Sequence, residues 1–177
     1  RWNTSTGILS GDVMLVKVYE MLAAAVTEHH VKEVLGMFNR TAIEVCEGQQ
    51  LDMEFENAVK VTEDQYIEMI RLKTASLLGF SLELGAFLAG APRSEQVALG
   101  AFGLNMGIAF QLRDDFLDVY ADNNKFGKLV GGDIVSNKKT FLLIKAIELS
   151  KGKMKSELTA LLKAKKFVKS SKVKAMT

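Results

Sequence analysis

The sequence predicts an all-α protein built as a bundle of antiparallel helices, and three observations support this. Only one proline occurs in 177 residues, although an all-β chain needs such residues at its turns. Residues that favour helices, such as Ala, Leu, Met, Lys and Glu, are abundant. Apolar residues recur in steps of three and four and do not alternate as in strands. We therefore expect residues 1–177 to form a single all-α domain, and because the sequence starts at Arg1, an incomplete portion of a longer chain.

The first half of the chain contains three predicted helices. Cap residues precede an apolar run over residues 13–27, whose composition favours a largely buried helix. An apolar stripe with helical spacing predicts a second helix over residues 31–58. Thr62 followed by Gln65 matches a capping box, so we expect a third helix from there to about Leu88.

The second half changes character near residue 121. Pro92 ends the third helix, and we expect a long, mostly buried helix from Ser94 to Tyr120. Residues 121–137 contain repeated glycines and polar residues, which predicts a long loop with a functional role. Two further helices are expected over residues 140–150 and 156–169.

Composition excludes several classes of function. Residues 151–177 carry nine lysines but no arginine, and we expect a solvated basic surface with no nucleic-acid partner. The most apolar run, residues 75–91, is interrupted by polar residues, so no transmembrane segment is expected. The single cysteine, Cys46, has no partner for an intramolecular disulfide, which favours a cytoplasmic location.

The segment Gln111–Asp118 concentrates three carboxylates on one helix. Asp114 and Asp118 are four residues apart and share a helical face, and Asp115, which directly follows Asp114, lies at the neighbouring position around the helix. Hard oxygen ligands of this kind suit Mg²⁺ that carries a phosphate substrate. An exposed acidic face is the alternative, but the apolar residues on both sides disfavour it. We predict a Mg²⁺ site formed by Asp114, Asp115 and Asp118.

Three lysines lie at positions in the sequence where they could bind an anion. Lys73 interrupts the buried face of the third helix beside Thr74. Lys128 lies in the glycine-rich loop, and Lys138 follows the glycine-rich segment 131–133, where backbone N–H groups can approach an anion. Each lysine alone is more often a surface charge. Together with the acidic helix, they predict a diphosphate site.

The segment Gly107–Asp118 resembles the Gly-x-x-Phe-Gln-x-x-Asp-Asp-x-x-Asp motif of the trans-isoprenyl diphosphate synthases, also called polyprenyl synthetases. Further segments follow in the order of that family: Leu9–Asp12, Gly48-Gln49 with Asp52, Lys73–Ala75, Phe126–Lys128, Gly131–Ile134 and Asn137-Lys138. The resemblance covers about Trp2 to Ser150. The first aspartate-rich motif of the family, and the basic residues around it, do not occur in this sequence.

The resemblance implies the isoprenoid-synthase fold, with antiparallel helices around a central cavity, and a homodimer. It implies a prenyltransferase that condenses isopentenyl diphosphate with an allylic diphosphate. In that reading Asp114, Asp115 and Asp118 hold Mg²⁺, while Lys73, Lys128 and Lys138 bind the leaving diphosphate. Gln111 and Thr74 would steady the allylic cation or the diphosphate. These five residues are the implied catalytic and substrate-binding set.

Two alternatives stay open at this point. A class I terpene cyclase shares the fold, but it normally has an Asn/Ser/Glu metal motif instead of a second Asp-Asp-x-x-Asp. A non-catalytic subunit or a truncated pseudoenzyme of a prenyl synthase usually loses aspartates, whereas this chain keeps all three in the motif it has. The sequence does not indicate the product length or the allylic primer.

Overall fold

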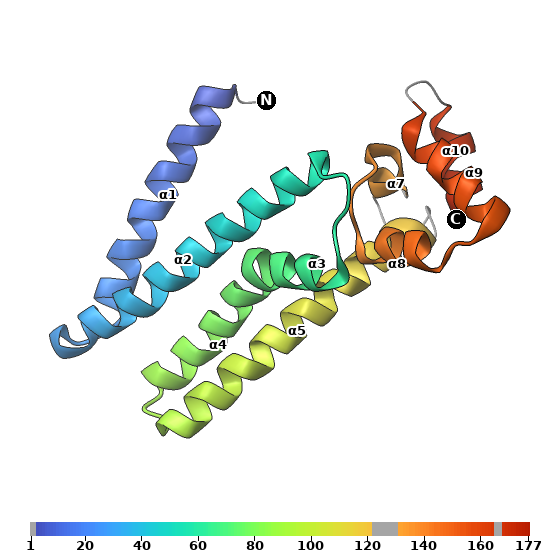
Figure 1. Cartoon of the computed structure of the whole chain (residues 1–177). Helices are drawn as coiled ribbons and strands as arrows, with labels where there is room; N and C mark the ends of the chain where they lie inside the picture. The colour runs from blue at the N-terminus through green and yellow to red at the C-terminus, as the bar shows by residue number, and fades with distance from the viewer. Residues whose placement is uncertain (1–2, 122–130, 165–167) are drawn as a thin grey trace.

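The structure is a computed structural model that describes residues 3–121, 131–164 and 168–177. These residues contain helices and no strand, which confirms the all-α prediction. In chain order the elements are α1 (Thr4–Ala24), α2 (Glu28–Asn57), α3 (Glu63–Ile70), the π-helical η1 (Arg71–Ala75), α4 (Ser76–Leu88), α5 (Arg93–Tyr120), α7 (Gly132–Ser136), α8 (Phe141–Leu149), α9 (Gly152–Lys163) and α10 (Lys169–Met176) (Figure 1).

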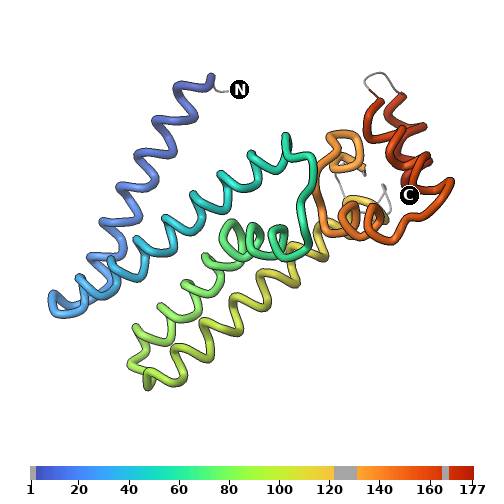
Figure 2. The backbone as a smooth tube through the Cα atoms, in the orientation of Figure 1, coloured from blue at the N-terminus to red at the C-terminus, as the bar shows by residue number. Residues whose placement is uncertain are grey.

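The centre of the molecule is formed by α2, by the continuous run α3–η1–α4, and by α5. Helices α4 and α5 pack side by side in antiparallel directions, and α2 packs against η1 and α4 (Figure 1). Near the C-terminal end of α5, a cluster of buried apolar residues joins α3 to α8: Val61, Tyr66, Met69, Ile70 and Ile144. The chain trace in Figure 2 places α7 to α10 at this end of the molecule and α1 at the opposite edge.

Glycines let the central helices approach to backbone contact. A Cβ atom on Gly48 of α2 would overlap the backbone nitrogen of Lys73 in η1. A Cβ on Gly107 of α5 would lie 2.5 Å from the Cα of Ala75. Any side chain at either position would therefore push α2 or α5 away from η1. This close contact holds the segment with Lys73 and Thr74 between two long helices.

The predicted helix from Thr62 to Leu88 forms as one continuous run. The side chain of Thr62 accepts from the backbone N–H of Gln65 at 3.3 Å, and the Gln65 side chain accepts from the Thr62 N–H at 2.9 Å, so the capping box is confirmed. The run contains a π-helical turn at Arg71–Ala75, which sequence periodicity did not reveal. It ends before Gly90, whose φ of 72° is left-handed.

Burial was predicted wrongly for two helices. No residue of α1 is buried, although we expected a largely buried helix over residues 13–27. In α5 the buried positions are mainly glycines, while Phe102 and Phe110 are 60% and 63% exposed. Apolar composition shows that a helix can be buried, but not which neighbour covers it. Within this chain α1 packs mainly against α2, which leaves most of its apolar side chains exposed.

The C-terminal third also differs from the prediction in detail. The expected loop over residues 121–137 includes the short helix α7, which starts after the left-handed Gly131. The helix expected over residues 156–169 is instead represented by α9, ending at Lys163, and by α10. Among the described helices, none combines the length and the apolar character that crossing a membrane requires.

Candidate functional site

The predicted site residues gather where the last turns of α5 meet α3, η1, α7 and α8. The acidic residues and Gln111 project from the C-terminal part of α5, and Thr74 comes from η1. Lys138 lies between α7 and α8. Lys128, which we also predicted, lies outside the described residues.

Asp115 is the buried member of the acidic motif, with 2% of its surface exposed. It accepts hydrogen bonds from the Tyr66 hydroxyl and from Nε2 of Gln111 at 3.1 Å, and the backbone N–H of Phe141 lies close enough to favour its charged form. Burial raises the pKa of Asp115, and these hydrogen bonds together with the charge of Lys138 oppose that shift. Burial and the adjacent carboxylate also raise the pKa of Tyr66, so its hydroxyl stays protonated and donates.

Thr74 and Gln111 are brought together as the sequence predicted. The Thr74 hydroxyl donates to Oε1 of Gln111 at 3.2 Å. The amide nitrogen of Gln111 is already bound to Asp115, so both ends of this side chain are held. Thr74, Gln111, Asp115 and Tyr66 therefore form one chain of hydrogen bonds through the site.

Asp114 and Asp118 have different surroundings from Asp115. One carboxylate oxygen of Asp118 accepts from the backbone N–H of Asp133 at 3.0 Å, which ties the first turn of α7 to α5. Asp114 is partly exposed and makes no hydrogen bond or ion pair within the described part of the chain. Asp114 and the second oxygen of Asp118 are thus the carboxylate groups of the motif that remain available to a ligand.

Asp133 adds a further acid to this group. Burial raises the pKa of Asp133 to about 6, Lys138 opposes that shift, and the charges of Asp118, Asp115 and Asp114 add to it. Mutual repulsion of this kind means that the site favours an added cation. We had noted Asp133 only within a glycine-rich segment and had not named it as a site residue.

Of the two described lysines that we predicted, only Lys138 lies near the acids of α5. Lys138 lies close enough to Asp115 and Asp133 for its positive charge to oppose the rise in pKa that burial causes at both carboxyl groups. Lys73 instead forms an ion pair with Asp52 of α2, and these side chains are 31% and 16% exposed. From the sequence, Asp52 was named only as part of a family motif, without a role. Tyr66 was not singled out, because a lone tyrosine on an apolar face carries no motif.

The donor set fits Mg²⁺ in the form in which that ion usually binds phosphates. No group of three His, Cys, Asp or Glu side chains among the described residues is arranged to hold a metal ion by itself. Mg²⁺ commonly takes only one or two carboxylates and completes its shell with water and substrate phosphate. Asp114 and Asp118 can supply those two carboxylates.

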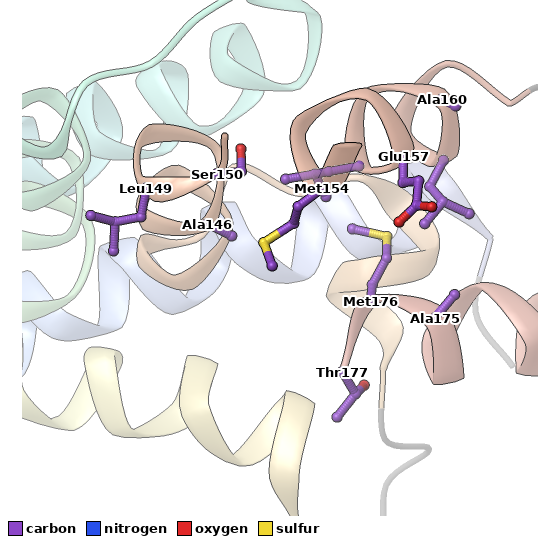
Figure 3. Close-up of a pocket in the computed structure, with 11 residues that line it drawn as sticks. Ala146, Leu149, Ser150, Met154, Glu157, Ala160, Ala175, Met176 and Thr177 are labelled. Carbon is purple, nitrogen blue, oxygen red and sulfur yellow. The ribbon is translucent and has the colours of Figure 1, made fainter. Parts of the chain in front are cut away.

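Two adjoining cavities open beside the acidic group. The smaller, of about 130 Å³, is lined by Asp133, Lys138 and Thr140 together with apolar side chains of α5 and α8. The larger, of about 710 Å³, lies between α8, α9 and α10, where Met154 and Met176 extend into it (Figure 3). The larger cavity is lined mainly by apolar side chains, so we place the chemistry at the smaller one, which Asp133 and Lys138 line.

The whole chain, residues 1–177, matches the family model described as polyprenyl synthetase. The protein therefore belongs to the polyprenyl synthetase family, as its motifs had suggested.

Known relatives agree with this assignment. The chain is 39% identical over 161 residues to the short chain isoprenyl diphosphate synthase of Methanothermobacter thermautotrophicus, covering 91% of this chain and 50% of that protein. Its structure matches geranylgeranyl pyrophosphate synthetase from Pyrococcus horikoshii with a TM-score of 0.87 and 36% identity, over 99% of this chain and 53% of that one. Polyprenyl synthase from Caulobacter crescentus, solved with calcium and isoprenyl diphosphate, matches with a TM-score of 0.86 and 27% identity, over 99% and 52%. The chain thus spans about half the length of the relatives it matches.

Proposed function

We propose that this protein is a trans-prenyltransferase that condenses isopentenyl diphosphate with an allylic diphosphate. The observation that carries the proposal is the Asp-Asp-x-x-Asp turn of α5, where Asp114 and Asp118 lie close enough to Asp133 to affect its pKa, as Lys138 also does. The relatives support the substrate class, since they are isoprenyl diphosphate synthases and one was solved with isoprenyl diphosphate.

Asp114 and Asp118 would hold Mg²⁺, and Asp115 was expected to join them. When bound, Mg²⁺ would neutralise charge on the diphosphate and make it a better leaving group. Lys73, Lys128 and Lys138 would bind the diphosphate oxygens, and Lys73 would do so by exchanging its contact with Asp52 for the ligand.

The reaction then follows from charge. The allylic C–O bond breaks, the diphosphate leaves with the electron pair, and an allylic cation remains. The double bond of isopentenyl diphosphate attacks that cation to form a C–C bond, and loss of a proton restores a double bond. The oriented dipoles of Gln111 and Thr74 would steady the positive charge while it exists.

We further propose that the protein acts as a homodimer in the cytoplasm. The exposed apolar side chains of α1 support an association surface, and the single Cys46 supports a reducing compartment. No partner among nucleic acids is proposed.

Asp114→Asn tests the assignment. The substitution keeps the shape of the side chain and removes a charge needed most as the diphosphate departs, so kcat should fall on the order of 10²-fold while KM changes less. Thermal stability without Mg²⁺ should hold or rise, because repulsion with Asp118 is relieved. The measurement is incorporation of labelled isopentenyl diphosphate with allylic primers of different length.

Glu47→Gln is the matched control, since Glu47 is an exposed acid on α2 that makes no ion pair with any residue the structure describes. It should keep wild-type turnover. Wild-type turnover in Asp114→Asn would refute the assigned role. An inactive wild-type chain would favour the non-catalytic subunit or pseudoenzyme.

A further inference from the structure

Asp115 is surrounded by polar groups of three helices. Tyr66 of α3 and Gln111 of α5 donate hydrogen bonds to it, and the Phe141 N–H in the first turn of α8 lies close enough to favour its charged form. Tyr66 and Asp115 are each only 2% exposed, so water does not compete for these hydrogen bonds. A carboxylate that is buried and already accepts hydrogen bonds on both oxygens, from Tyr66 and from Gln111, has little remaining capacity to bind a ligand. Asp115 is therefore placed to hold protein elements together.

Each element that meets at Asp115 carries a group of the proposed site. Gln111 is fixed by Asp115 at one end and by Thr74 at the other. Lys138 lies three residues before Phe141, and the intervening Thr140 is the cap of α8, accepting from Leu143 N–H at 3.3 Å. The ring of Tyr66 also packs against that of Phe141, with ring centroids 6.5 Å apart, so loosening Tyr66 and Asp115 would release the segment that presents Lys138.

We propose that Tyr66 and Asp115 are positioning residues, a buried pair that fixes Gln111 and the Lys138 segment relative to the ligand-facing Asp114 and Asp118. This inference rests on the proposed function and assigns Asp115 a different task from metal binding. It also gives Tyr66, which belongs to no aspartate-rich motif, a part in the activity.

Tyr66→Phe and Asp115→Asn are the informative changes. Tyr66→Phe removes the hydroxyl and keeps the ring in the core, and Asp115→Asn keeps the size of the side chain. Each substitution should lower kcat about tenfold or more and leave KM for the allylic substrate within about threefold of the wild-type value. The double variant should lose no more kcat than the worse single variant, because both residues act through one contact. Tyr19→Phe is the control, since it removes a hydroxyl on the exposed α1 that donates to Asn39 of α2, away from the site. It should leave kcat unchanged.

The Mg²⁺ dependence separates positioning from ligation. Asp115→Asn should leave the Mg²⁺ concentration for half-maximal rate within about twofold, whereas Asp114→Asn should raise it about tenfold. An equal rise in both variants would make Asp115 a metal ligand and overturn the proposal. Unchanged kcat in Tyr66→Phe, with an active wild-type protein, would overturn it as well.

Hydrogen exchange gives a readout that needs no turnover. Amides at the start of α8, residues 141–144, should exchange at least tenfold faster in Tyr66→Phe and Asp115→Asn, and at the wild-type rate in Tyr19→Phe. If the wild-type chain has no activity, the proposed function fails, but this measurement still tests whether Tyr66 and Asp115 hold the start of α8 in place. Unchanged exchange in both variants would overturn it.

Discussion

At the scale of single residues, Asp133 links the charge of the site to the stability of the fold. Its pKa is raised from 3.8 to about 6, mainly by burial. Between about pH 4 and pH 6 the folded protein therefore binds a proton more readily than the unfolded chain. Stability should be greatest below this window, fall as the pH rises through it, and stay low above pH 6. The loss should be about 1–2 kcal/mol once solvent screening is allowed for.

Asp133→Asn should remove that pH dependence and stabilise the protein at pH 7.5 by a similar amount. Denaturant unfolding between pH 4 and pH 8 would measure it, with the exposed Asp12→Asn as the control that keeps the wild-type profile. If the two variants lose stability in parallel as the pH rises, the raised pKa of Asp133 is not the source of the pH dependence.

Single residues also mark the limit of prediction. Thr74 meets Gln111 as expected because both lie in motifs whose spacing is readable. The roles of Asp114, Asp115 and Asp118 were not separable, since one residue of helical rotation decides which of them turns into the core. The role of Tyr66 could not be predicted from the sequence for a related reason. Its partner is 49 residues away, and no local pattern records such a contact.

At the scale of elements, the glycine contacts are the structural reason for two motif positions. Gly48→Ala and Gly107→Ala would each place a Cβ against the backbone of η1. We expect each to destabilise the fold by about 1–3 kcal/mol and to reduce kcat, because the segment with Lys73 and Thr74 must move.

Gly85→Ala is the matched control within the same bundle. Apart from its chain neighbours and the nearby backbone of its own helix, no atom of the described residues lies within 4 Å of a Cβ at that position, so the change should stabilise α4 by about 0.5–1 kcal/mol. Thermal melting of the three variants would compare them directly. Equal effects at Gly48, Gly107 and Gly85 would mean that helix propensity, and not close packing, explains the motif glycines.

Element boundaries were predictable where chemistry marks them. The capping box at Thr62 and the stop at Gly90 both occur as expected. Helix α7 was not foreseen, because it has only five residues and its start depends on the left-handed Gly131.

At the scale of the whole molecule, the order of motifs was enough to predict the fold and the family, since several motifs at matching spacing constrain the path of the chain. Which helix faces are buried by a neighbouring element was not predictable. Burial of α1 depends on what lies beside it, and apolar composition alone does not name a neighbour.

The exposed apolar face of α1 leads to a prediction about assembly. Val13 and Met14 are 59% and 68% exposed, and a second copy of the chain would remove this surface from water. We expect sedimentation to show a dimer, and Val13→Lys with Met14→Lys to shift it toward monomer without loss of helix content. Lys substitution at the isolated, exposed Val59 is the control. A wild-type monomer at all concentrations would contradict the homodimer.

The π-helical turn at Arg71–Ala75 explains how one helical run can touch α5 twice. Tyr66 and Thr74 are eight residues apart, and in an uninterrupted α-helix they would differ in direction by about 80°. The π turn absorbs one residue, so the pair is spaced as if by seven and both side chains reach α5. The turn therefore behaves as a one-residue insertion. Deleting one residue there should leave one regular α-helix in which Tyr66 and Thr74 are seven residues apart and differ in direction by only about 20°, so both should still reach α5.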